Sequence, residues 1–112
     1  MKKRYGSSLI LMLLCVLFAA AAANAEWVRN GVPVCSADDG QQTPMIVPDG
    51  ANGAIVVWAD YRTGNDWDIY GNRITGDGFV LGGPGDVPAC TAAGYQTAGG
   101  IVLDGVGGVI VV

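Results

Sequence analysis

The sequence predicts an all-β protein built from antiparallel repeat units, and three observations support this prediction. The chain has 112 residues, of which 18 are glycine and only 14% are charged. Its valine and isoleucine residues gather in short runs that are separated by glycine, proline, asparagine and aspartate, a pattern typical of strands and turns. One segment also recurs after a fixed interval, and no segment beyond residue 25 has helical periodicity.

The N-terminal segment, residues 1–25, is predicted to be a secretory signal peptide. A basic stretch at 2–4 precedes an uncharged apolar run at 9–23, and the run ends in the small-x-small sequence Ala23-Asn24-Ala25. The alternative is an uncleaved membrane anchor, but the run is shorter than the roughly 20 residues that cross a bilayer. We therefore expect cleavage before Glu26 and export to the extracellular space, the cell surface or the periplasm, with no membrane span in the mature chain.

The segment that follows, residues 26–112, is acidic. It carries ten acidic residues, three arginines and no lysine, which gives a formal charge of −7. Nucleic-acid binding needs a basic surface, so this class of function is excluded, and binding to anionic lipid is disfavoured. The absence of histidine excludes catalysis by Ser-His-Asp or Cys-His groups within this chain, together with any histidine-ligated metal site.

Four short strands are predicted in the first part of this segment, in the order 44–47, 53–58, 68–74 and 79–81. Pro48-Asp49-Gly50 is a turn sequence that separates the first two strands. The polar residues 63–66 supply the next turn, and the third strand alternates as a half-buried strand does. Asp77-Gly78 is a hairpin signal before the fourth strand.

An internal repeat is the most informative feature of the sequence. Residues 32–57 align without a gap on 87–112 at an offset of 55, and 13 of the 26 aligned positions are identical. A fixed period of this size is typical of repeat arrays. We therefore divide the chain into the signal peptide, a first repeat unit with its N-terminal lead-in at 26–86, and an incomplete second repeat unit at 87–112.

Four-stranded antiparallel units in series are the blades of a β-propeller, so the predicted fold is propeller-like with about one and a half blades. The motif Asp-Gly-x-x-Gly-Ala-Ile-Val-x-Trp-x-Asp-x-Arg at 49–62, followed by Asp-Ile-Tyr at 68–70, resembles a repeat of secreted bacterial propeller-type proteins. Most of these proteins are uncharacterised, so the resemblance implies the fold and says little about function. It covers residues 31–112.

Arrays of this kind generally need at least three units, because one unit cannot bury both of its faces. We therefore expect the chain to be truncated and not to form a complete stable domain alone. Its exposed repeat edge would then favour self-association.

Asp60 and Arg62 are the first candidate site residues, because side chains two apart on a strand point to the same face. Arg62 is expected to pair with Asp68 on the neighbouring strand. One interpretation is a carboxylate and a guanidinium that line a ligand pocket at the propeller mouth. The other, which we favour, is an ion pair that fixes strand geometry in every blade.

Aromatic residues near this pair supply further candidates. Trp58, Tyr61 and Trp67 either stack on a sugar or fill the space between blades, and core packing is the favoured role. The candidate binding surface consists of Trp58, Asp60, Arg62 and Trp67.

Asp66 and Asp68 are weak candidates for calcium ligands, because carboxylate oxygens are ligands that calcium takes. Neither an EF-hand loop nor a calcium-binding glycine-rich array is present, and turn residues explain these aspartates equally well. We therefore predict no cofactor.

No residue is a convincing nucleophile, because Ser36, Cys35 and Cys90 lack a histidine to activate them. Cys35 and Cys90 occupy equivalent repeat positions, so we expect two free, partly buried thiols rather than a disulfide. The predicted function is a non-catalytic binding or structural surface module for an unknown carbohydrate or protein ligand. The alternative is an N-terminal fragment of a secreted carbohydrate-active enzyme whose catalytic residues lie beyond Val112.

Overall fold

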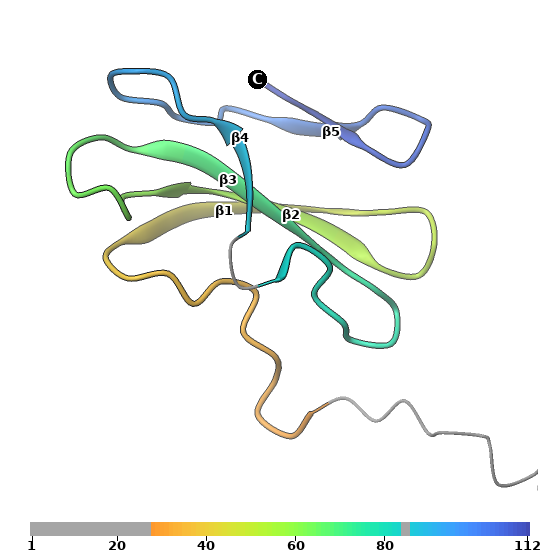
Figure 1. The fold of residues 1–112 in the computed structure, drawn as a ribbon. Coiled ribbons are helices and arrows are strands. Elements are labelled where there is room, and N and C mark those ends of the chain that lie inside the picture. The colour runs from red at the N-terminus through yellow and green to blue at the C-terminus, as the bar shows by residue number, and fades with distance from the viewer. Residues whose placement is uncertain (1–27, 84–85) are drawn as a thin grey trace, which may run out of the picture.

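The computed structural model describes residues 28–83 and 86–112 (Figure 1). The predicted signal peptide lies outside these described residues. Within them the elements are six β-strands, without an α-helix, so the all-β prediction is confirmed. The described part of the chain has no helix that is long and apolar enough to span a membrane.

The strands form two antiparallel sheets. The larger sheet has the order β1-β2-β3-β4 and consists of β1 (Gln41–Pro48), β2 (Ala54–Asp60), β3 (Asp68–Ile74) and β4 (Val87–Cys90). The smaller sheet consists of β5 (Ile101–Leu103) and β6 (Val109–Val111). Figure 1 shows the β5–β6 hairpin across one face of the larger sheet, where β5 contacts β1.

The core lies in the two central strands of the larger sheet. Its buried apolar side chains come from β2 and β3 and are Ile55, Val57, Trp58, Ala59 and Ile69. Both faces of β2 are covered. Ile55 and Val57 lie beneath the β5–β6 hairpin, whereas Val56 and Trp58 face Val34 and Cys35 of the N-terminal lead-in. Because both of its faces are covered, β2 is a continuous apolar run rather than an alternating one.

The position of the fourth strand differs from the prediction. Residues 79–81 form only an isolated bridge, Ile74 to Val80, and the fourth strand is β4, which pairs with the first half of β3. The reason is that two segments share one edge of β3. The backbone of Leu81 donates to Arg73 at 2.8 Å, but the next amide, at Gly82, donates to the side chain of Asn72 at 2.6 Å, which ends the pairing.

The β1–β2 hairpin of the larger sheet and the β5–β6 hairpin have the same register. In the first, Ile46 pairs with Val56 and Val47 pairs with Ile55. In the second, the pairs are Ile101 with Val111 and Val102 with Ile110, each 55 residues later. The aligned sequence segments therefore adopt the same strand pairing.

Candidate functional site

A buried carboxylate, Asp60, stands at the centre of the candidate site. It is the last residue of β2 and is fully buried. Its Oδ1 accepts hydrogen bonds from the backbone N–H and the Nε of Arg62, both at 2.9 Å. Its Oδ2 accepts from Arg62 Nη2 at 2.6 Å and from the indole N–H of Trp58 at 2.8 Å. Burial alone would raise the pKa of Asp60, but the bonds from Arg62 and Trp58 outweigh it and lower that pKa to about 2.

Arg62 joins two carboxylates and an aromatic ring. Its Nη2 lies 2.6 Å from Asp60 and 2.8 Å from Asp86, and its guanidinium carbon lies 3.8 Å from the centre of the Tyr70 ring. Hydrogen bonding to Asp60 raises the pKa of the guanidinium, so Arg62 remains charged. The predicted ion pair with Asp68 is wrong. The Nε and Nη2 of Arg62 both donate to Asp60, so the side chain folds back onto its own strand.

Asp86 and Asn72 complete the network, and sequence reasoning missed both. Asn72 Nδ2 donates to Asp86 Oδ1 at 2.9 Å and to the backbone oxygen of Val34 at 3.2 Å. Asn72 could have been found from the sequence, because asparagine is disfavoured inside a strand and its presence there indicates a side chain with bonding partners. No sequence pattern indicates the role of Asp86, since this residue lies in a loop far from Arg62 in sequence.

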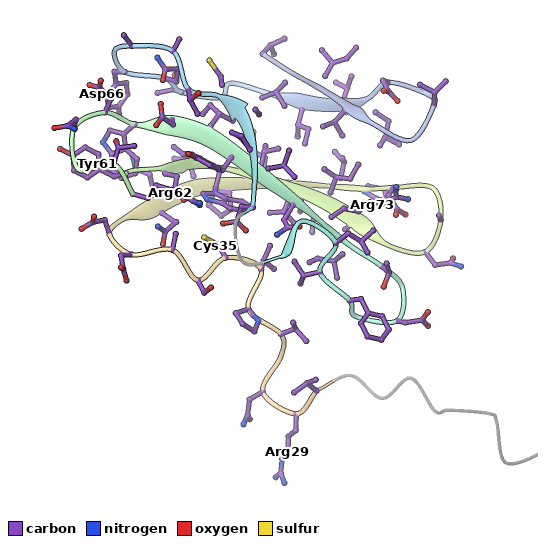
Figure 2. The ribbon with its side chains drawn as sticks, viewed as in Figure 1. Arg29, Cys35, Tyr61, Arg62, Asp66 and Arg73 are labelled. Carbon is purple, nitrogen blue, oxygen red and sulfur yellow. The ribbon has the colours of Figure 1, made fainter. Side chains whose placement is uncertain are left out.

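Cys35 brings the lead-in into the same network. Its Sγ lies 3.6 Å from Arg62 Nη2 and accepts the backbone N–H of Ala37 at 3.4 Å, and Figure 2 shows it beside Arg62. Burial is the main cause that raises the pKa of this thiol. The thiol therefore stays protonated near neutral pH and is a poor nucleophile. Cys35 is half-buried and Cys90 is exposed, and both are free.

The network holds four segments of chain together: the lead-in, the end of β2, strand β3 and the loop before β4. Asp60, with a pKa of about 2, is ionised at physiological pH and has no proton to donate as a general acid. Trp58 and Asp60 are both buried, so these two members of the candidate binding surface do not reach solvent. The geometry therefore suits an architectural role.

An aromatic edge lies at the turn between β2 and β3. The Trp67 ring is half-buried, 5.1 Å from the ring of Tyr61 and 6.5 Å from that of Tyr95. Tyr95 is 63% exposed, and the adjacent amide of Gln96 donates to the backbone oxygen of Trp67 at 2.8 Å. Figure 2 shows Tyr61 at this end, with Arg73 at the opposite end of the sheet. Sequence reasoning missed Tyr95, because only folding brings it to Trp67.

The two calcium candidates are engaged in the fold. Asp66 Oδ2 accepts the backbone N–H of Gly94 at 3.3 Å, which ties the turn to the segment after β4. Asp68 is buried at the start of β3. Among residues 28–83 and 86–112, no group of three or more histidine, cysteine, aspartate or glutamate side chains could hold a metal ion.

Comparison of the chain with protein-family models, with curated proteins and with solved structures gave no match. The resemblance to propeller-type repeats therefore stays a prediction, which rests on residues 49–62 and 68–70. What the protein does has to be argued from its own geometry.

Proposed function

We propose that this chain is an exported, non-catalytic β-repeat module of the propeller-blade type, which presents a binding or structural surface. The observation that carries the proposal is one hairpin geometry that recurs after 55 residues. The turns agree as closely as the strands. Asp49 Oδ1 accepts the backbone N–H of residues 51 and 53 at 2.7 and 2.8 Å. Asp104 Oδ1 accepts those of residues 106 and 108, both at 2.8 Å.

The stacking of the two sheets supports units in series. Val111 of β6 lines the same groove as Val57 of β2. Val111 corresponds to Val56 at the 55-residue offset, and Val56 lies on the other face of β2, towards the lead-in. One face of the second unit therefore covers the opposite face of the first, which is how like units stack in an array. The contact between β1 and β5 joins equivalent strands, as neighbouring blades do around an axis.

The polar network supports a non-catalytic role. Its carboxylates, Asp60 and Asp86, are paired with Arg62 inside the protein. A motif of this kind stabilises each unit in which it occurs, and it leaves its charged groups bonded to one another rather than directed at a substrate.

The aromatic edge formed by Tyr61, Trp67 and Tyr95 is the surface we assign to ligand binding. Tyrosine and tryptophan rings offer an apolar face and a hydrogen-bonding group to a ligand, and the acidic charge of residues 26–112 disfavours an anionic one. We therefore propose a neutral carbohydrate as the ligand class.

A glycan array followed by titration, with tryptophan fluorescence as the signal, tests this role. Tyr95→Ala is expected to weaken glycan binding about ten-fold, which corresponds to roughly 1.4 kcal/mol. Phe79→Ala is the matched control, because Phe79 is an exposed aromatic residue on a different turn, and it should leave affinity unchanged. An array without a bound neutral glycan, or equal effects of both variants, would contradict the binding role.

Export is tested separately by mass spectrometry of the protein from the medium or cell envelope. The chain should begin at Glu26. An intact chain that begins at Met1 and is embedded in the membrane would overturn this part of the proposal.

A further inference from the structure

We propose that the free edge of β6 is an acceptor for an antiparallel strand that carries an arginine for Asp104. This inference rests on the proposed repeat and adds a partner to it. The second sheet contains only β5 and β6, so β6 has one strand neighbour within the described residues. An edge strand presents unpaired backbone N–H and C=O groups, and an extended segment can add to it by main-chain hydrogen bonds.

The first hairpin shows what its equivalent edge accepts. There β2 pairs with β3, and Arg73 lies opposite Ile55. The Nε and Nη2 of Arg73 donate to Asp49 Oδ2 at 2.8 and 2.7 Å. Asp49 Oδ1 accepts hydrogen bonds from the backbone amides of its own turn. Asp49 Oδ2 is therefore the oxygen that binds the arginine of the neighbouring strand, β3.

The second hairpin presents the same carboxylate. Asp104 Oδ1 accepts two backbone amides of its turn, and these bonds, that of Val106 first, lower the pKa of Asp104 so that it is ionised. The residue is exposed, and no ion pair to it forms within 28–83 and 86–112. Its Oδ2 therefore corresponds to the oxygen that binds Arg73 in the first hairpin.

A groove beside β6 offers room for the side chains of an added strand. It has a volume of about 380 Å³ and is lined mainly by apolar residues of β2, β3, β4 and β6. In the first sheet Ala54 pairs with Ile74 and Val56 pairs with Asn72. At the 55-residue offset these partners would lie opposite Val109 and Val111, which both line the groove. An added strand like β3 would thus direct an isoleucine, opposite Val109, and an asparagine, opposite Val111, into the groove.

The arginine of the same strand would lie on the other face, because neighbouring side chains on a strand alternate. It would stand opposite Ile110, which is 55% exposed, and its aliphatic stem would cover that side chain. The partner is therefore an extended segment of the chemistry of β3, with isoleucine directly after arginine.

The test uses the full isotope-labelled protein and a synthetic peptide with the sequence of residues 66–76. Peptide addition should shift the backbone amide signals of β6, at Val109, Ile110 and Val111. A peptide with glutamine in place of Arg73 should bind about two- to five-fold more weakly, the range expected for an exposed ion pair. This peptide variant leaves the protein itself unaltered, so a loss of binding cannot come from misfolding.

The protein variant Asp104→Asn should weaken binding of the unmodified peptide to the same degree, because this variant keeps the Oδ1 acceptor of the turn and removes the negative charge. Asp38→Asn, at another exposed aspartate, is the matched control and should not change affinity. Shifts confined to β1 or β4, an absence of shifts, or equal affinity of both peptides would overturn the proposal. None of these results depends on glycan binding, so a failure of strand addition and a failure of the glycan-binding role can be told apart.

Discussion

The indole N–H of Trp58 donates to Asp60 Oδ2 at 2.8 Å, and both side chains are buried on the same face of β2. Arg62, which follows two residues later, neutralises that carboxylate and bonds both of its oxygens. An aromatic residue, an acid and a base at alternate positions thus form one bonded group. Because Asp60 is inside the protein, Trp58 and Arg62 satisfy its carboxylate, and each of them uses it as a hydrogen-bond acceptor.

Asp60→Asn should lower the free energy of unfolding by about 3 kcal/mol, because it removes the charge of a fully buried carboxylate and leaves the half-buried guanidinium of Arg62 with one carboxylate fewer. Urea unfolding followed by tryptophan fluorescence measures this loss. Asp77→Asn, at an exposed turn position, is the control and should change stability by less than about 0.5 kcal/mol. Equal stability of the two variants would show that the network is not structural.

Stability should fall in acid through Asp60. Its pKa of about 2 in the folded protein lies below the value of about 3.9 for an unfolded chain. Its contribution, about 2 kcal/mol, is therefore complete above pH ~4 and is lost as the pH falls through 2. The difference in unfolding free energy between the wild type and Asp60→Asn should shrink over this window. A difference that stays constant from about pH 5 to pH 2 would contradict the assignment.

Equivalent glycines in the two hairpins should respond differently to alanine. A Cβ at Gly53 would collide with the backbone oxygen of Ile74 and lie 2.8 Å from Asp49 Oδ2, whereas a Cβ at Gly108 would meet only the Asp104 side chain. Backbone cannot move aside as an exposed side chain can. We expect Gly53→Ala to cost about 2 kcal/mol more than Gly108→Ala, within the usual range for overpacking. Thermal melts of both variants measure this difference, and similar losses would contradict the close approach of β3.

The two cysteines should differ in reactivity towards a thiol reagent. Cys90 is exposed, whereas Cys35 is half-buried and has a pKa raised chiefly by burial. Because the thiolate is the reactive form, Cys90 should react at least about ten-fold faster in the folded protein. Unfolding without reductant should make the two rates equal. The time course of modification should have a fast and a slow phase, and serine variants at each position assign each phase to its cysteine. A single slow phase for both residues would contradict the structure.

Local chemistry allowed much of the fold to be predicted. The turns at Asp49-Gly50 and Asp77-Gly78 and the strand at 68–74 depend on residues close together in sequence. Backbone preferences and side-chain alternation act over such short distances. The fourth strand could not be placed in this way, because residues 79–81 and 87–90 compete for one edge of β3.

By itself, the sequence determined the all-β class, most of the strands and the 55-residue correspondence between the two hairpins. Only the tertiary structure decided that Asp86 and Cys35 meet Arg62, that Asn72 bonds Asp86, and that Tyr95 reaches Trp67. Strand patterns and turns follow from residues that are neighbours along the chain. Contacts between distant residues depend on which edge and which face each segment covers, and this is settled by burial and hydrogen bonding across the whole fold.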